Sequence, residues 1–117
     1  MKRKNCCPIA QALGVLGDKW SLIVLRDVIF SKKRHFNDLL ASPEKISTNI
    51  LSNRLKTLQE ESLLCCSVDL ENRRSKIYTP TEKAQDLVPV LVELYKWGEK
   101  YNDRADTAVN PMQDEPF

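Results

Sequence analysis

Hydrophobic residues recur at intervals of three and four positions through much of the chain, which predicts a largely helical protein. Residues 8–16 form a first short amphipathic segment, and residues 19–30 form a second one with a broader apolar face. We expect Gly17 to end the first helix in a left-handed conformation and Asp18 to cap the second. A third, shorter segment covers residues 36–40, so the first part of the chain predicts three consecutive helices.

The stretch 46–64 reads ISTNILSNRLKTLQEESLL and predicts a fourth helix with two contrasting faces. Ser47 stands where an N-cap residue belongs, and Leu51, Leu55 and Leu58 share one face at three- and four-residue spacing. The polar residues on the other side are Asn49, Ser52, Asn53 and Lys56, with Arg54 on the flank. This polar face is a candidate binding surface, although a solvated helix surface would have the same composition.

The hydrophobic period changes after the fourth helix. Residues 63–79 contain β-preferring and small residues around a polar turn, which predicts a β-hairpin. A long final helix follows, with Thr79 and Glu82 as a capping box and Pro80 in its first position. Pro89 should kink this helix or begin a new one, because proline lacks a backbone donor. An apolar stripe then runs along the helix through Leu87, Leu91, Leu94, Tyr95, Gly98 and Tyr101.

A chain of 117 residues with 42% hydrophobic content can bury one modest core, which predicts a single domain. We expect residues 1–105 to form that domain and the polar, proline-containing residues 106–117 to be a disordered tail. The start, MKRKNCCPIAQALGVLG, does not predict a secretory signal, because Pro8 and Gln11 interrupt the apolar run and no cleavage site follows. No window approaches the ~18 consecutive apolar residues that span a membrane. We therefore expect a cytoplasmic protein.

The distribution of charge is uneven although the formal net charge is only +2. Residues 1–76 carry 14 basic and 8 acidic side chains, whereas the remainder carries 4 basic and 8 acidic ones. A basic segment of this kind indicates a polyanionic partner, because Lys and Arg release condensed counterions from phosphates. An ordinary solvated surface is the alternative explanation of the same numbers.

Four cysteines occur as two adjacent pairs, Cys6-Cys7 and Cys65-Cys66. Without a secretory signal reduced thiols are the default, and adjacent cysteines make poor zinc ligands, so we expect no metal and no cofactor. On the predicted strand Cys65 and Cys66 should point to opposite faces, with one of them buried. An enzyme such as a small thiol oxidoreductase has little support, because the chain lacks a C-x-x-C motif and a glycine-rich phosphate loop. Its one imidazole, His35, is better interpreted as a loop or helix-start residue, or as a phosphate contact.

The predicted order of elements is that of a winged helix-turn-helix, which is a mainly α fold with a small β-hairpin (α+β). In this fold the fourth helix enters the major groove of DNA, where amides pair with adenine and lysine pairs with guanine or phosphate. The hairpin, or wing, touches the flanking backbone. The predicted DNA-binding residues are Lys32, Lys33, Arg34, Ser47, Thr48, Asn49, Ser52, Asn53, Arg54, Lys56, Arg73, Arg74 and Lys76. A winged helix that only contacts other proteins is the competing interpretation.

A series of short motifs occurs in a fixed order along the chain. They are Cys7-Pro8, GDKW at 17–20, LIVLRDV at 22–28, RHFNDLL at 34–40, ISTNILSNRLKTLQEESLL at 46–64, YTPTEKA at 78–84 and LVPVLVELYKWGEKY at 87–101. Together, over residues 7 to about 101, they resemble the HxlR family of bacterial winged-helix transcription regulators, which is related to MarR-type proteins. The resemblance implies a homodimer on an inverted-repeat operator, with the N- and C-terminal helices at the dimer interface. Leu94, Trp97 and Tyr101 are then expected at this interface, whereas core packing suits Leu87 and Leu91.

The resemblance also points to a sensing thiol. In several members of the family the cysteine of the Cys-Pro motif senses oxidants or electrophiles, and Cys7 occupies that position here, with Cys6 beside it as a departure from the single cysteine. A thiol near a helix N-terminus and close to Lys2, Arg3 and Lys4 should carry more thiolate and react more readily. The alternatives are that Cys7 is a small buried hydrophobe at the helix start, and that the regulator responds to a small ligand instead of a thiol reagent.

Overall fold

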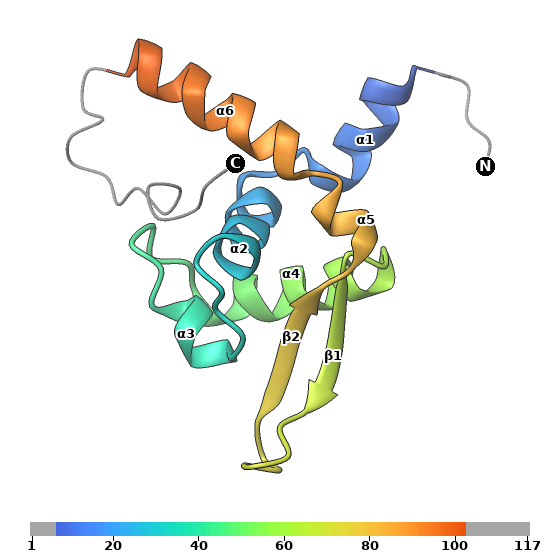
Figure 1. Cartoon of the computed structure of the whole chain (residues 1–117), viewed down its shortest axis with the longest axis vertical. Helices are drawn as coiled ribbons and strands as arrows, with labels where there is room; N and C mark the ends of the chain where they lie inside the picture. The colour runs from blue at the N-terminus through green and yellow to red at the C-terminus, as the bar shows by residue number, and fades with distance from the viewer. Residues whose placement is uncertain (1–6, 103–117) are drawn as a thin grey trace.

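The computed structural model describes residues 7–102, which form six helices and one two-stranded antiparallel sheet (Figure 1). In chain order the elements are α1 (Pro8–Leu16), α2 (Lys19–Ile29), α3 (Phe36–Leu40), α4 (Thr48–Glu60), β1 (Leu64–Val68), β2 (Lys76–Pro80), α5 (Glu82–Gln85) and α6 (Val88–Tyr101). The predicted mainly helical fold with one hairpin is confirmed. The predicted tail at 106–117 and the candidate thiol Cys6 lie outside the described residues.

Helix α2 is the centre of the core and packs against α1, α3, α4, α6 and β2. Val24, Leu25 and Val28 of α2 are at most 2% exposed, and the apolar face of α4 closes over them. Burial of each such side chain stabilises the fold by about 1.5–3 kcal/mol. In Figure 1, α4 crosses below α2 and the hairpin extends downward beside it, while α1 and α6 lie at the opposite end.

Helices α2 and α4 begin at the N-cap residues that the sequence predicts. Asp18 Oδ1 accepts hydrogen bonds from the backbone N–H groups of Trp20 and Ser21, both at 2.9 Å, and so caps α2. Ser47 Oγ accepts from Ile50 N at 3.2 Å and caps α4. Each cap satisfies backbone donors that a helix cannot satisfy internally, which is why both helices begin where they do.

The capping box predicted for the last helix assigns the cap to the wrong threonine. Thr81, not Thr79, caps α5, because its Oγ1 accepts from Ala84 N at 3.2 Å and donates to the Ser62 carbonyl at 2.7 Å. Thr79 and Pro80 instead end β2, where Pro80 pairs with Leu64 across the sheet. Cross-strand pairing thus extends the strand through the predicted helix start. Pro89 then begins a separate helix, which was one of its two predicted effects, since α5 ends at Gln85 and α6 begins at Val88.

Gly17 does not adopt the predicted left-handed conformation. Its φ is −74°, and its N–H donates to the Leu13 carbonyl at 2.8 Å as a right-handed continuation of α1. A Cβ at this position would collide with the same carbonyl oxygen, so a close backbone approach explains the glycine. Within residues 7–102, positive φ values occur instead at Lys32, Lys45 and Ser62, all in connections between elements.

No helix within residues 7–102 combines the length and the apolar character needed to cross a membrane.

Candidate nucleic-acid interface

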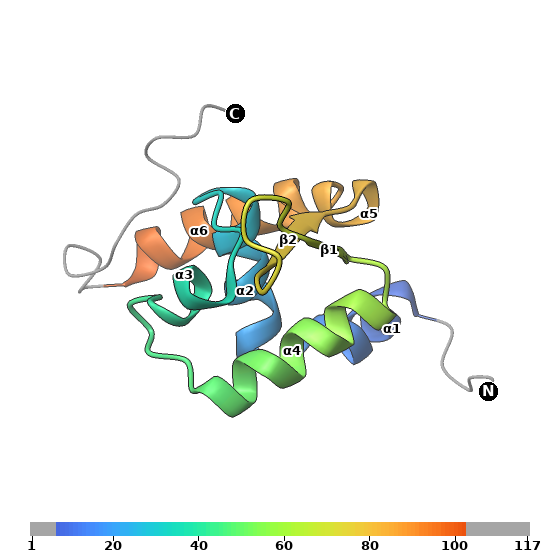
Figure 2. The same cartoon turned by 90° about the horizontal axis from the view of Figure 1, so that it is seen from below.

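The polar face of α4 points into solvent along the whole helix. Leu51, Leu55 and Leu58 are at most 2% exposed, and their burial fixes the rotation of the helix about its axis. Seen from the side toward which the hairpin projects, α4 and the hairpin lie in front of α2, so the face of α4 turned away from its buried leucines is open on this side (Figure 2). Its exposed residues are Ser47, Thr48, Asn49, Ser52, Asn53 and Lys56. The predicted outward orientation is confirmed, whereas contact of these residues with DNA stays a prediction.

Arg54, predicted on the flank of this face, lies against the start of α2 instead of pointing fully outward. Its Nε is 3.4 Å from Asp18 Oδ1, and its side chain is 29% exposed. Partial burial would raise the pKa of the Asp18 carboxyl, but hydrogen bonds from Ser21 and the charge of Arg54 outweigh it and lower the pKa. Arg54 therefore ties α4 to the cap of α2, and any contact with DNA would come in addition to this pair.

The basic loop before α3 is also partly turned inward. Lys33 Nζ lies 3.7 Å from Asp27 Oδ2, and Arg34 donates to the carbonyl oxygens of Val28 and, at 3.1 Å, of Lys33. The Arg34 carbonyl in turn accepts from Tyr78 N at 2.8 Å, which attaches the loop to β2. Of the three predicted contacts in this loop, only Lys32 is exposed.

The hairpin forms a wing whose basic side chains are exposed. The strands pair from Leu64 with Pro80 to Val68 with Lys76, and residues 69–75 form the tip. Asp69 N donates to the Ser75 carbonyl at 3.0 Å, and Asp69 Oδ1 accepts from Glu71 N at 2.9 Å, so the tip is closed by its own hydrogen bonds. The predicted phosphate contacts Arg73, Arg74 and Lys76 all lie on its exposed surface.

His35 connects the wing to the first helix of the motif, a role that sequence reasoning missed. It occupies the N-cap position of α3 without capping the helix through its side chain. Its Nε2 lies 3.1 Å from Asp69 Oδ2 and its Nδ1 lies 3.5 Å from Asp38 Oδ2. Asp69 is 34 residues away in the chain, so no local pattern could have indicated the pair.

A charged network around Arg26 joins α2 to the turn before α4. Its two terminal nitrogens donate to the two carboxylate oxygens of Glu44 at 2.7 and 2.8 Å. The same guanidinium donates to Asp27 Oδ1 at 2.8 and 2.9 Å, and the Asp27 side chain is only 4% exposed. Ser42 Oγ completes the network by donating to Glu44 Oε1 at 2.6 Å. These bonds hold the segment 42–44 against α2 and so position the start of α4.

Acid should weaken this network through Glu44. Hydrogen bonds from Arg26 lower the pKa of the Glu44 carboxyl from 4.5 to about 2, against the opposing effect of burial and with help from Ser42. Because the folded pKa lies below the unfolded one, the stabilisation is fully present above pH 4.5 and is lost as the pH falls toward 2. Urea unfolding across this range should show a loss of roughly 1–3 kcal/mol in the wild type that Glu44→Gln lacks. Glu93→Gln, on an exposed side chain of α6, should follow the wild type. The same pH dependence in wild type and Glu44→Gln would contradict this assignment.

The cysteines differ from expectation on one point. Cys7 is exposed at the N-cap position of α1, so it is not the buried space-filler that was the alternative to sensing. Cys65 is exposed, whereas Cys66 is half-buried opposite Tyr78 and packs against the core, so one cysteine of the pair faces inward as predicted but is not fully buried. The hairpin is only two strands wide and leaves both of its faces partly open. Among residues 7–102 no group of three or more His, Cys, Asp or Glu side chains could hold a metal ion.

Comparison with known proteins gives consistent matches over most of the chain. The family model of HxlR-like helix-turn-helix proteins matches residues 15–106. YdeP, an HTH-type transcriptional regulator of Bacillus subtilis, is 34% identical over 100 residues, which cover 86% of this chain and 77% of YdeP. The crystal structure of PA1607, described as a transcription factor, is similar with a TM-score of 0.79 at 33% identity, over 92% of this chain and 73% of PA1607. The reduced form of the transcriptional regulator YodB from B. subtilis is similar with a TM-score of 0.65 at 26% identity, over 86% of this chain and 99% of YodB.

A helix-turn-helix with an exposed polar second helix and a basic wing defines a class of DNA-binding regulators. Within that class, the chain belongs to the HxlR-like helix-turn-helix family. The resemblance carried by the sequence motifs is thereby confirmed. The protein is a transcriptional regulator, as are its relatives, and not an enzyme.

Proposed function

We propose that the protein is a sequence-specific DNA-binding regulator that acts in the cytoplasm as a homodimer on an inverted-repeat operator. The observation that carries this proposal is that α4, whose polar residues are exposed and whose leucines are buried, lies at the same end of the molecule as the wing (Figures 1 and 2). With α4 in the major groove, Asn49 and Asn53 reach base edges while the wing contacts the flanking backbone. Two such helices in a symmetric dimer would enter successive major grooves about 34 Å apart.

The apolar surface at the opposite end of the molecule supports the homodimer. Ile9 and Leu13 of α1 are 71% and 57% exposed, and Leu94, Trp97 and Tyr101 of α6 are 49%, 66% and 63% exposed. In a monomer these large apolar side chains would remain exposed to water along two helices. An exposed apolar patch of this kind marks an interaction site. A second copy of the chain, related by a two-fold axis, would bury the same helices on both subunits.

Asn53→Ala is expected to weaken binding to the operator by roughly tenfold, because base-specific amide contacts contribute about 1–3 kcal/mol. The same variant should leave binding to DNA of random sequence nearly unchanged. Arg73→Ala should weaken both equally, because a phosphate contact does not depend on sequence. Fluorescence-anisotropy titrations of both duplexes measure these effects.

The matched control for Asn53→Ala is Gln85→Ala, which removes an exposed amide from α5. It should bind both duplexes as the wild type does. Equal operator affinity of wild type, Asn53→Ala and Gln85→Ala would remove the basis for the assignment of α4 as the base-reading helix.

A thiol reagent is the proposed effector. YodB, similar to this chain over most of its length, has been solved in reduced, quinone-bound and diamide-treated forms. Cys7 stands at the start of α1, whose exposed apolar residues belong to the proposed dimer interface. Modification of Cys7 would therefore change dimer geometry and with it the spacing of the two α4 helices, provided that the two geometries differ in DNA affinity.

Treatment with diamide should change the operator affinity of the wild type by about tenfold or more. Cys7→Ser should abolish the response without changing the affinity of the reduced protein. Cys6→Ser tests the adjacent thiol separately, and anisotropy with and without the oxidant is the readout. A full response in Cys7→Ser would exclude Cys7, and no response in the wild type would favour the alternative of a small-ligand effector.

A further inference from the structure

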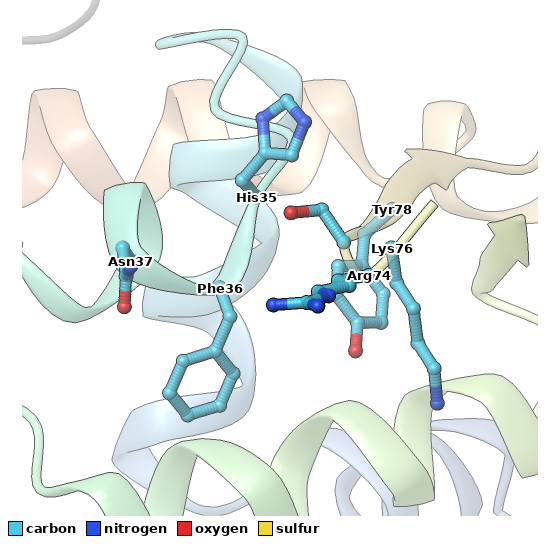
Figure 3. Close-up of a pocket in the computed structure, with 7 residues that line it drawn as sticks. His35, Phe36, Asn37, Arg74, Lys76 and Tyr78 are labelled. Atoms are coloured by element: carbon cyan, nitrogen blue, oxygen red, sulfur yellow. The ribbon is translucent and has the colours of Figure 1, made fainter. Parts of the chain in front are cut away.

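A polar cleft opens between the start of α3 and the wing. It has a volume of about 300 Å³ and is lined by residues 35–37 on one side and by residues 74–76 with Tyr78 on the other. Figure 3 shows the Arg74 guanidinium pointing from the wing toward Phe36 and Asn37, and the Lys76 ammonium pointing toward α4. The cleft therefore carries two cations, one of which points toward α4.

The charge of this cleft is unbalanced in favour of the two cations. Arg74 and Lys76 are exposed, and within the part of the chain that the structure describes neither pairs with an acidic side chain. Two carboxylates beside the cleft, those of Asp38 and Asp69, face His35 instead, and Glu71 of the wing tip forms no ion pair with either cation within residues 7–102. The positive charge is thus available to a ligand.

The pair of His35 and Asp69 acts as a latch across one end of the cleft. A carboxylate only accepts hydrogen bonds, so His35 Nε2 donates to Asp69 Oδ2 at 3.1 Å. The other carboxylate oxygen of Asp69 accepts from Glu71 N at 2.9 Å, and Asp69 N donates to the Ser75 carbonyl. Through Asp69, His35 is therefore connected to the hydrogen bonds that close the tip of the wing. The distance between residues 35–37 and residues 74–76 is therefore set partly by this one side-chain pair.

We infer that this cleft seats one phosphate group of the DNA backbone, with Arg74 and Lys76 as its ligands and the His35–Asp69 pair as the latch that holds the two cations in place. The inference rests on the proposed DNA-binding function. A guanidinium beside an ammonium suits a phosphodiester, because both donate charge-assisted hydrogen bonds to its anionic oxygens. The latch also explains why a DNA-facing wing carries an aspartate. The Asp69 carboxylate, which would otherwise repel the phosphate, accepts a hydrogen bond from His35.

The first test is the salt dependence of binding to a duplex of random sequence. Loss of one phosphate contact lowers the slope of log affinity against log salt by about 0.9 per subunit. Arg74→Gln should show this decrease. Lys96→Gln, which removes one exposed charge from α6, should keep the wild-type slope. An equal slope in Arg74→Gln and wild type would overturn the inference.

The second test uses the sign of the effect of Asp69→Asn. Removing a carboxylate from a DNA-facing surface should strengthen binding if only net charge matters. The latch predicts the opposite, a roughly fivefold loss, because the asparagine keeps the turn through Oδ1 but puts an NH2 donor where a charged carboxylate oxygen accepted from His35. His35→Gln should show a similar loss, and the double variant should be no worse than either single one. Stronger binding by Asp69→Asn, or additive losses in the double variant, would overturn the latch.

A free phosphate compound is the alternative ligand of the cleft, because it has the same anionic oxygens as the DNA backbone. Inorganic pyrophosphate at constant ionic strength tests this alternative. If the cleft is built for DNA, pyrophosphate should not raise the thermal midpoint of the DNA-free protein. An increase that Arg74→Gln abolishes would assign the cleft to a free anion and overturn the backbone assignment. If the wild-type protein bound no duplex at all, the proposed DNA-binding function would be overturned. If the wild type bound DNA normally and the variants bound it equally well, only the assignment of the cleft would be overturned.

Discussion

Arg26→Ala is expected to lower the free energy of unfolding by about 2–4 kcal/mol, the largest stability effect of any single side chain considered for this fold. The guanidinium is the shared partner of Asp27 and Glu44, and its removal leaves the buried carboxylate of Asp27, among the residues that the structure describes, with only Lys33 as a charged partner at 3.7 Å. An uncompensated buried charge costs more than the lost ion pair itself, because it has given up its hydration. The thermal midpoint should fall by at least about 10 °C, as measured by circular dichroism.

Two further variants separate charge from geometry. Arg26→Lys keeps the positive charge but cannot form the fork-shaped contact with Glu44, so an intermediate loss is expected. Arg73→Ala removes an exposed arginine from the wing and should leave the midpoint unchanged. Since the network positions the turn before α4, operator affinity of Arg26→Lys should also fall while the protein is still folded. A midpoint of Arg26→Ala equal to that of the wild type would rule out the network as a support of the fold.

Trp97→Glu is expected to convert the proposed dimer to a monomer and to weaken operator binding by about 100-fold or more. Trp97 is 66% exposed in the single chain and packs against Tyr101 with ring centroids 5.5 Å apart and ring planes tilted by 53°, so the two rings form one apolar surface. A carboxylate at its centre would be desolvated in the interface. Loss of the second subunit removes half of the phosphate contacts and the simultaneous engagement of two half-sites. Light scattering after size exclusion measures the mass, and anisotropy measures the affinity.

The control for this variant is Lys96→Gln, which makes the same change of one charge unit on a neighbouring exposed residue of α6. It should remain dimeric and bind as the wild type does. A monomeric wild type, or a dimeric Trp97→Glu variant, would show that this face of α6 does not form the interface.

The helices and their caps were predictable because their determinants are local. The leucines of α4 recur at helical spacing, and the side chains of Asp18 and Ser47 bond backbone groups only two or three residues away. The end of β2 was not predictable in this way. Threonines stand on both sides of Pro80, and only the pairing of Pro80 with Leu64 across the sheet decides which of them caps the next helix. Local rules identified the right kind of cap at the wrong threonine.

The side-chain partners of the basic residues could not be predicted from the pattern of charge. Arg34 and Arg54 both fit a DNA-binding surface by sequence, yet one bonds backbone carbonyls and the other lies against Asp18. His35 pairs with Asp69 because the hairpin lies beside the start of α3, although the two residues are 34 positions apart in the chain. These contacts join segments far apart in the chain, so three-dimensional packing decides which basic side chains stay available to a ligand.

The central claim is tested most directly by a fluorescence-anisotropy titration of the wild type against its own upstream intergenic DNA and a shuffled duplex of the same composition, at two salt concentrations. The account predicts affinity for the upstream DNA at least ~10³-fold above that for the shuffled duplex, with both falling steeply as salt rises. Equal affinity for the two duplexes, or binding that salt does not weaken, would contradict a sequence-specific regulator that reads DNA with α4 and holds it with the wing.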